Sequence, residues 1–340
     1  MPIRDWVFGL FGRRPRRRTT RGIQRGPAVH VVILDGTMSS LARGAETNAG
    51  ATFKLINEGG RRDNLTVHYE AGIQWRDWSS TLDIVTGRGI DRQIERSYGV
   101  LASRWREGDR IVLIGYSRGA YAVRSLGGMI GAMGLLRRRE ATVRNIETAW
   151  RHYRAGAVSP GADAFRDAYC ETGVVIEAVA VWDTVKALGV RLPLIWRWSR
   201  KHYLFHDHRL GPHVRNGFHA LALDETRIAY APVMWESRES WTGGLEQVWF
   251  RGTHGDVGGQ LSGHDAARPL ANVPLVWMLG RLEACGVALP EGWADRFVQD
   301  AGAPSVGAWN GWKWIFWARR RRLVGRDPSE RLHESVERAR

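Results

Sequence analysis

The sequence predicts an α/β protein with a mostly parallel sheet and helices on both faces. Apolar runs of strand length alternate along the chain with stretches in which apolar residues recur every three or four positions. The first run, residues 28–34, ends at the turn signal Asp35-Gly36-Thr37. Strands and helices that alternate in this way pair into a parallel sheet covered on both faces.

The predicted elements follow one another in this alternating order. We expect strands at residues 28–34, 65–69, 110–114, 174–182, 218–223 and 246–250. We expect helices at residues 45–58, 88–106, 118–131, 139–154 and 272–285. The stretch 188–210 interrupts the alternation with aromatic and aliphatic residues among Arg and His, and we interpret it as a cap.

Length and composition place the chain among globular proteins. It has 340 residues, of which 44% are hydrophobic, enough for a substantial core and outside the composition of disordered or collagen-like chains. We expect a basic leader at 1–27, one large domain at 28–300 and a tail rich in Trp and Arg at 301–340. The two cysteines cannot build a disulfide framework or a four-ligand zinc site, which indicates a reducing compartment.

Most of the formal charge of +15 lies at the two ends of the chain. Residues 1–26 hold eight Arg and one Asp, and residues 312–340 hold nine basic and four acidic side chains. Codon bias of a GC-rich genome and phosphate recognition both explain such an excess of Arg. Both ends also carry aromatic residues, a combination that suits an anionic membrane surface. For the tail, packing of its Trp residues on the domain is an equal alternative, and the leader is expected to be disordered off the membrane.

No apolar run is long enough to span a bilayer, and the order of the N-terminal residues is the reverse of a secretory signal. We therefore expect a cytoplasmic protein with peripheral membrane contact. The basic ends would bind nucleic acid without specificity, and no feature adds base readout. No nucleotide-binding glycine motif follows a strand, so no cofactor is predicted. The cluster of His202, His206, Asp207 and His208 lacks a partner set elsewhere, so no metal site is predicted.

The residues 115–119, Gly-Tyr-Ser-Arg-Gly, are the strongest chemical signal. A serine between a strand and a helix sits on a strained turn, and the two flanking glycines let strand and helix approach closely. Ser117 is therefore the candidate nucleophile. Its first oxyanion donor is the backbone N–H of Arg118, and the loop of Gly36 and Thr37 is the natural source of the second.

A serine nucleophile needs a base and an acid that orients the base. His254 follows the strand at 246–250 in a glycine-rich loop, at the sheet edge where open α/β sheets bind ligands. Two acids compete for the third position. Asp183 follows the strand at 174–182, Asp224 follows the next strand, and chain order alone leaves both open.

Four separated motifs resemble a known family. They are Gly115–Arg124, Val181–Val185, His219–Glu225 and Trp249–Gly259, and together they are similar to the α/β-hydrolase domain family that includes phospholipase effectors of type VI secretion. The resemblance covers about residues 28–285. It implies an α/β-hydrolase fold, a triad of Ser117, Asp183 and His254, hydrolysis of glycerophospholipid esters and non-classical export.

The family pattern is not matched everywhere. After Asp35-Gly36-Thr37 the family usually continues with an aromatic residue and Asn, whereas this chain has Met38 and Ser39. The Tyr69–Gly72 motif usually runs into Gly-Thr, whereas Ile73 and Gln74 follow here. Two other functions therefore remain open: an inactive hydrolase-fold protein that binds a membrane or protein partner, and a basic protein that associates with nucleic acid.

Overall fold

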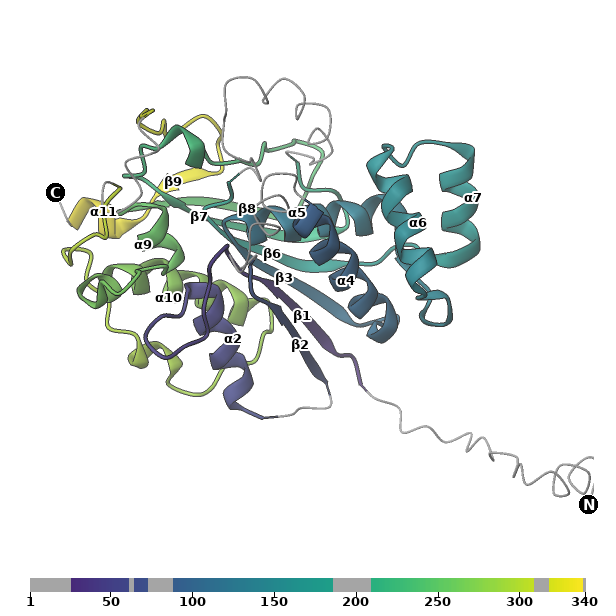
Figure 1. Ribbon diagram of the computed structural model, residues 1–340, viewed down its shortest axis with the longest axis horizontal. Helices are drawn as coiled ribbons and strands as arrows, with labels where there is room; N and C mark the ends of the chain where they lie inside the picture. Colours follow the sequence, from purple (N-terminus) through teal and green to yellow (C-terminus); the bar gives the residue numbers. More distant parts are fainter. Residues whose placement is uncertain (1–25, 61–63, 73–87, 186–208, 309–317, 339–340) are drawn as a thin grey trace, which may run out of the picture.

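A parallel β-sheet is the centre of the molecule (Figure 1). The structure is a computed structural model that describes residues 26–60, 64–72, 88–185, 209–308 and 318–338. Most of the predicted leader, most of the predicted cap at 188–210 and the Trp residues of the predicted tail at 309–317 lie outside the described residues.

Seven strands of the described chain form this sheet in the order β2-β1-β3-β6-β7-β8-β9, and every neighbouring pair is parallel. Their bounds are β1 Val29–Leu34, β2 Leu65–Glu70, β3 Arg110–Tyr116, β6 Ile176–Trp182, β7 Val214–Ala222, β8 Gly244–Phe250 and β9 Glu330–Leu332. A separate antiparallel pair joins β4 Leu135–Leu136 to β5 Cys170–Glu171. Because the central strands are parallel, their carboxyl ends share one edge, where loops from distant parts of the sequence meet.

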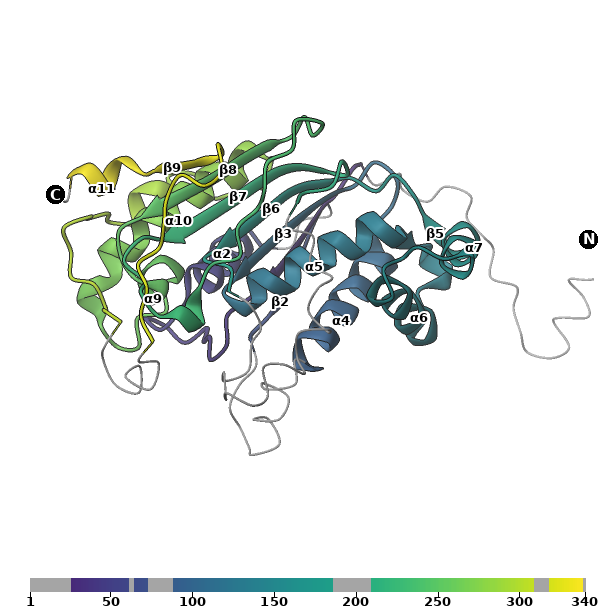
Figure 2. The same cartoon turned by 90° about the horizontal axis from the view of Figure 1, so that it is seen from above.

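Helices cover both faces of the sheet, and the strand residues alternate between them. In β1, Val32 and Leu34 belong to the core on one face, whereas Val31 and Ile33 belong to the core on the other. The first core is completed by α4 Arg88–Arg104, α5 Arg118–Met133, α6 Val143–Arg154 and α7 Pro160–Tyr169. The second core is completed mainly by α2 Asn48–Glu58 and α10 Arg268–Ala284, on the opposite side in Figure 2.

The predicted α/β-hydrolase type of fold, with a parallel sheet between two layers of helices, is confirmed. All six predicted strands and five predicted helices are present, with ends shifted by a few residues. The structure adds α7, which starts at the N-cap Ser159 with Pro160 at its first position. It also adds the short α9 His254–Gly258 and α11 Glu334–Arg338.

The sheet extends past the domain boundary predicted at residue 300. Strand β9 pairs with β8, and Trp249 of β8 donates its indole N–H to the Glu330 carboxylate at 2.8 Å. Gln247 of β8 likewise donates to the Ser329 hydroxyl at 2.9 Å. Residues in the segment 318–338 are thus packed against the main sheet.

Candidate active site

Ser117 occupies a strained turn between β3 and α5. Its φ of 56° and ψ of −118° are unfavourable for a residue with a Cβ and cost on the order of 1–3 kcal/mol. The flanking glycines are required by contact: a Cβ on Gly115 would lie 2.6 Å from Ala120 Cα, and one on Gly119 would lie 2.0 Å from the Leu34 carbonyl oxygen. The tight turn places Ser117 at the N-terminal end of α5, with 7% of its surface exposed.

His254 reaches Ser117 from the loop after β8. It is the first residue of α9, whose start is fixed by a capping box in which Thr253 N–H donates to the Asp256 carboxylate at 2.7 Å. Its Nε2 lies 2.8 Å from Ser117 Oγ. The buried ring stacks on Tyr116 with 5.0 Å between centroids and meets Tyr230 edge-on at 4.8 Å. The imidazole is therefore confined to one orientation facing the serine.

Asp183 follows β6 and lies on the other side of the imidazole. Its Oδ2 is 2.6 Å from His254 Nδ1, and its Oδ1 accepts the Ala222 N–H at 3.1 Å. Its φ is +38°, a second strained backbone position next to the site. Because an ionised carboxylate only accepts hydrogen bonds, Nδ1 carries the proton and the Nε2 lone pair faces Ser117. The three side chains thus form one hydrogen-bonded chain.

Asp224, the competing acid, has a different set of contacts. It is exposed, and its carboxylate accepts the Gly252 N–H at 2.6 Å, which fixes the turn that leads to His254. Its neighbour Glu225 is buried, forms an ion pair with Arg227 at 2.5 Å and accepts the His254 N–H at 3.2 Å. The structure brings Asp183 next to the imidazole, whereas Asp224 and Glu225 hold the backbone N–H groups of Gly252 and His254.

Arg322 is a member of the site that sequence reasoning missed. Its Nη1 and Nη2 donate to the two carboxylate oxygens of Asp183 at 2.5 and 2.9 Å, and the two side chains are 4% and 0% exposed. It also donates to the carbonyls of Ala222 and Tyr230 at 2.8 and 2.6 Å. Burial alone would raise the pKa of Asp183, but the guanidinium, and then the His254 hydrogen bond, hold that pKa far below its usual range. The carboxylate is therefore kept ionised.

The loop after β1 approaches Ser117 closely. A Cβ on Gly36 would lie 2.5 Å from the Tyr116 ring and 3.5 Å from Ser117 Cβ, so only glycine fits here. The Gly36 N–H is already donated to Asp35 Oδ1 at 2.6 Å, whereas the Thr37 carbonyl is held by the Gln260 side-chain amide at 3.0 Å. Within the described ranges, neither the Thr37 N–H nor the Arg118 N–H has a hydrogen-bond partner. Two backbone donors are thus left free beside the serine.

A comparison with protein families identifies the relatives of this chain. The model described as the catalytic domain of Tle1-like phospholipase effectors of the type VI secretion system matches residues 29–281. The chain belongs to this family. The predicted resemblance is thereby confirmed.

Individual relatives are distant from this Tle1-like chain. An uncharacterized protein of Saccharomyces cerevisiae, YEL023C, is 23% identical over 223 residues, which are 58% of this chain and 31% of the yeast protein. The structure of the Tle1 effector bound to the VgrG spike is 17% identical, with a TM-score of 0.34, over 69% of this chain and 51% of that one. An uncharacterized protein from Pseudomonas aeruginosa is 15% identical, with a TM-score of 0.46, over 81% and 50%. The chain spans about a third to a half of these relatives.

Side chains from two other segments support the loop beside Ser117. Tyr69 donates its hydroxyl to Asp35 Oδ2 at 2.7 Å, and Thr47 donates to the same oxygen at 2.6 Å. Burial raises the pKa of Asp35, and these hydrogen bonds oppose the rise. A Cβ on Gly72 would lie 2.0 Å from the Gly36 carbonyl oxygen, which explains why position 72 is a glycine. Met38, the next residue of this loop, has a φ of 61° and is 52% exposed.

No metal or membrane-spanning element belongs to the part of the Tle1-like chain that the structure describes. No group of three or more His, Cys, Asp and Glu side chains there could hold a metal ion. No helix there combines the length and the apolar character that a bilayer crossing requires. The predicted His202–His208 cluster is outside the described residues.

Proposed function

We propose that this chain is a serine hydrolase that cleaves the carboxylic esters of glycerophospholipids through an acyl-enzyme. Membership of the Tle1-like family supports a phospholipase-type substrate. The observation that carries the mechanism is the hydrogen-bonded chain from Asp183 through His254 to Ser117, with Nε2 only 2.8 Å from the serine oxygen. This arrangement supplies the nucleophile, base and orienting acid that acyl transfer requires.

In the proposed reaction, Ser117 Oγ attacks the ester carbonyl and its proton passes to His254 Nε2. The resulting imidazolium is stabilised by Asp183, and it returns the proton to the departing alcohol as the acyl-enzyme forms. Water then repeats the sequence with the acyl-enzyme and releases the fatty acid. The burial of all three side chains excludes competing water from their hydrogen bonds.

The developing oxyanion requires donors that are free in the resting enzyme. We assign these to the N–H groups of Arg118 and Thr37. Arg118 is the first residue of α5, so its N–H has no partner within the helix and lies at the positive end of the helix dipole. The Gly36 N–H is an unsuitable second donor, because Asp35 already accepts it at 2.6 Å.

Arg322 acts as a positioning residue in this proposal. It holds both Asp183 oxygens, and it shares Oδ2 with His254 Nδ1. A fixed cation at this position keeps the carboxylate ionised, so that Asp183 continues to accept the His254 Nδ1–H and to orient the imidazole.

The remaining parts of the proposal concern the substrate chain and the location of the enzyme. We assign the apolar stretch 188–210 to the acyl chain, and the basic aromatic ends at 1–27 and 301–340 to an anionic membrane surface. The effector family favours export as the route to that membrane.

The test is hydrolysis of a short-chain soluble ester and of phosphatidylglycerol vesicles by purified wild type, Ser117→Ala and the control Ser103→Ala. Ser103 is exposed at the end of α4 and donates its hydroxyl to the Val100 carbonyl, far from Ser117 in the sequence, so its variant should match wild type. Ser117→Ala should lose at least about 10³-fold in rate. A fluorophosphonate should label Ser117 in wild type, as read by peptide mass spectrometry. Hydrolysis by Ser117→Ala at the wild-type rate would refute the mechanism, whereas absence of hydrolysis in wild type would favour an inactive binding protein.

A further inference from the structure

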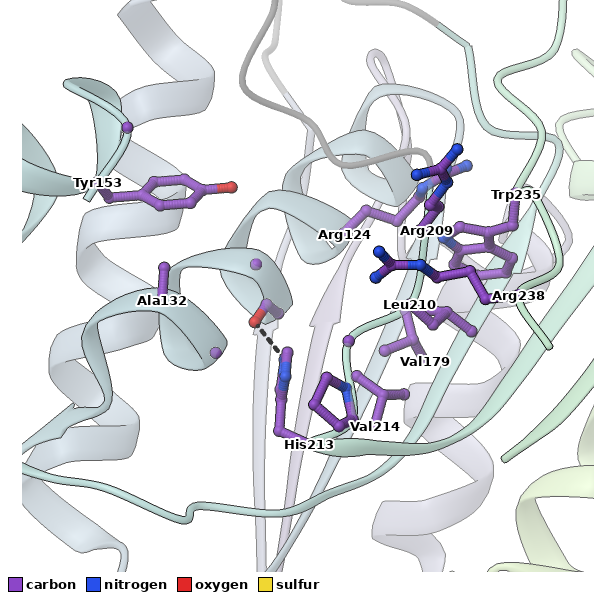
Figure 3. Close-up of a pocket in the computed structure, with 16 residues that line it drawn as sticks. Arg124, Ala132, Tyr153, Val179, Arg209, Leu210, His213, Val214, Trp235 and Arg238 are labelled. Atoms are coloured by element: carbon purple, nitrogen blue, oxygen red, sulfur yellow. Dashed lines mark hydrogen bonds between the residues drawn. The ribbon is translucent and has the colours of Figure 1, made fainter. Parts of the chain in front are cut away.

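The surroundings of Ser117 are formed by loops at the carboxyl edge of the sheet. The cavity of about 520 Å³ in Figure 3 lies along the middle of α5, and none of Ser117, Asp183 and His254 lines it. The turn of residues 36–39, in contrast, approaches the serine directly, because a Cβ on Gly36 would lie 3.5 Å from Ser117 Cβ. The contacts that hold this turn therefore affect where its backbone donors lie.

The turn 36–39 has a backbone conformation that its own residues do not favour. Ser39 N–H donates to the Gly36 carbonyl at 3.1 Å, and Met38, at the third position of the turn, has a φ of 61°. A positive φ at this position is typical of a type II turn, where glycine is usual because a Cβ is crowded. Rotation of the peptide group between Thr37 and Met38 would give a type I turn without this strain. The observed conformation therefore needs support from outside the turn.

Gln260 supplies such support. Its side-chain amide donates to the Thr37 carbonyl at 3.0 Å, and its Oε1 accepts the Tyr116 hydroxyl at 3.4 Å. Tyr116 is the last residue of β3 and directly precedes Ser117, so one side chain connects the turn to the strand that carries the nucleophile. Rotation of the peptide group after Thr37 would withdraw the carbonyl from this amide. The hydrogen bond thus favours the strained turn over the type I alternative.

The end of α9 fixes the position of Gln260. Gly259 ends this helix with a φ of 74°, and the Gln260 N–H donates back to the Gly255 carbonyl at 2.8 Å. These are the left-handed residue and the backbone hydrogen bond of a Schellman motif. His254 is the first residue of the same helix. One short helix therefore has the proposed base at its start and the anchor of the turn 36–39 directly after its end.

We propose that Gln260 is a positioning residue that holds the turn 36–39 in its strained conformation and thereby keeps the Thr37 N–H in place for the oxyanion. The inference rests on the proposed hydrolase function, in which this N–H is the second oxyanion donor. Thr37 is held through its carbonyl, whereas its N–H has no partner within the described ranges. A donor that is fixed beforehand stabilises the oxyanion without reorganisation, so Gln260 should affect the transition state more than ester binding.

The experiment measures kcat and KM of the full chain on a soluble short-chain ester across pH. Gln260→Ala removes the anchor, and the isosteric Gln260→Glu removes the amide donor but keeps the acceptor. The matched control is Gln299→Ala, at an exposed position, which should match wild type. Both Gln260 variants should lower kcat about 10- to 100-fold, with KM changed less than about threefold. The acid limb should stay in place, because the hydrogen bonds of His254 to Asp183 and Ser117 are left intact.

A change at Met38 tests whether Gln260 acts through the turn. Glycine adopts a positive φ without strain, so in Met38→Gly the turn should keep its conformation with less help from Gln260. The loss in kcat caused by Gln260→Ala should therefore be at least about threefold smaller in the Met38→Gly background. Circular dichroism checks that each variant is folded. A loss of activity through general destabilisation would not be reversed by a glycine in the turn.

The outcomes separate this inference from the proposed function. Wild-type kcat in folded Gln260→Ala and Gln260→Glu would overturn the inference, and so would equal losses in the two Met38 backgrounds. A shifted acid limb in Gln260→Ala would assign the effect to the base and would also overturn it. The proposed function stands in all three cases if Ser117→Ala is inactive. Hydrolysis by Ser117→Ala at the wild-type rate would overturn the proposed function and this inference with it.

Discussion

Replacing Arg322 by Gln should move the acid limb of the pH–rate profile to higher pH. In the wild-type protein the guanidinium and the imidazole both bind Asp183 Oδ2, at 2.9 and 2.6 Å. At an effective dielectric constant of about 20, an ion pair with its charges about 4 Å apart is worth ~4 kcal/mol. The Arg322 guanidinium is the largest of the interactions that hold the pKa of Asp183 below its usual range, so in Arg322→Gln this carboxyl takes up a proton at a higher pH and no longer orients the imidazole.

The assay is kcat/KM against pH on a soluble short-chain ester, which avoids effects of membrane binding. The matched control is Arg321→Gln, because Arg321 is the exposed neighbour and carries the same charge. Breaking the buried ion pair should also cost about 3–5 kcal/mol of folding stability, so folding is checked by circular dichroism at each pH. Arg322→Lys retains a cation and should keep the acid limb closer to its wild-type position. A folded Arg322→Gln enzyme whose acid limb coincides with that of wild type would refute the reasoning.

Three other changes test separate parts of the structure. Asp183→Asn should lower kcat/KM on the order of 10⁴-fold because the amide favours the wrong imidazole tautomer, whereas Asp224→Asn should cost less than about tenfold, as read by ester hydrolysis. Gly119→Ala should destabilise the fold by more than ~3 kcal/mol in urea unfolding, because its Cβ would lie 2.0 Å from the Leu34 carbonyl oxygen. Burial lowers the pKa of His219 to about 3, so below pH 6.5 the unfolded chain binds a proton at this residue that the folded chain does not. The free energy of unfolding therefore falls as the pH falls from 6.5 toward 3. His219→Gln should weaken this pH dependence, as measured by thermal melts at several pH values.

Two of these changes have a control within the chain, which for Asp183→Asn is Asp224→Asn. Gly127→Ala is the partner for Gly119→Ala, because its Cβ would meet only side chains at 3.6 Å or more and the change should be neutral or stabilising. Comparable destabilisation by both glycine variants would contradict the packing argument. Equal losses for the Asp183 and Asp224 variants would remove the assignment of the acid. An unchanged slope of stability against pH in His219→Gln would show that His219 is not the group that titrates.

Local sequence signals were sufficient for the strands and for the positions of Ser117 and His254. A buried parallel strand is a continuous apolar run, and the carboxyl ends of such strands must share one edge, so residues that follow them are brought together. Helix α7 could also have been predicted, because Ser159 and Pro160 are a standard N-cap and first helical position. It was missed because its apolar face is short.

The choice of acid could not be made from local signals. Asp183 and Asp224 each follow a strand, and only the geometry of the turns distinguishes their roles. Asp183 has a positive φ and its carboxylate contacts the imidazole, whereas the Asp224 carboxylate accepts the Gly252 N–H. The contact of Arg322 with Asp183 could not be predicted either, for a different reason. It is one of four consecutive arginines, and only the fold shows which of them is buried.

Arg322 also shows that the family match and the functional unit have different limits. The match ends at residue 281, and it contains Ser117, Asp183 and His254. A fragment with that limit would keep all three side chains, but it would leave the buried Asp183 carboxylate without its cation and β8 without the partner strand β9. An uncompensated buried charge costs several kcal/mol, and Asp183 would reduce that cost by taking up a proton. A protonated Asp183 would no longer orient the proposed base, so the proposed triad depends on a segment beyond the matched residues 29–281.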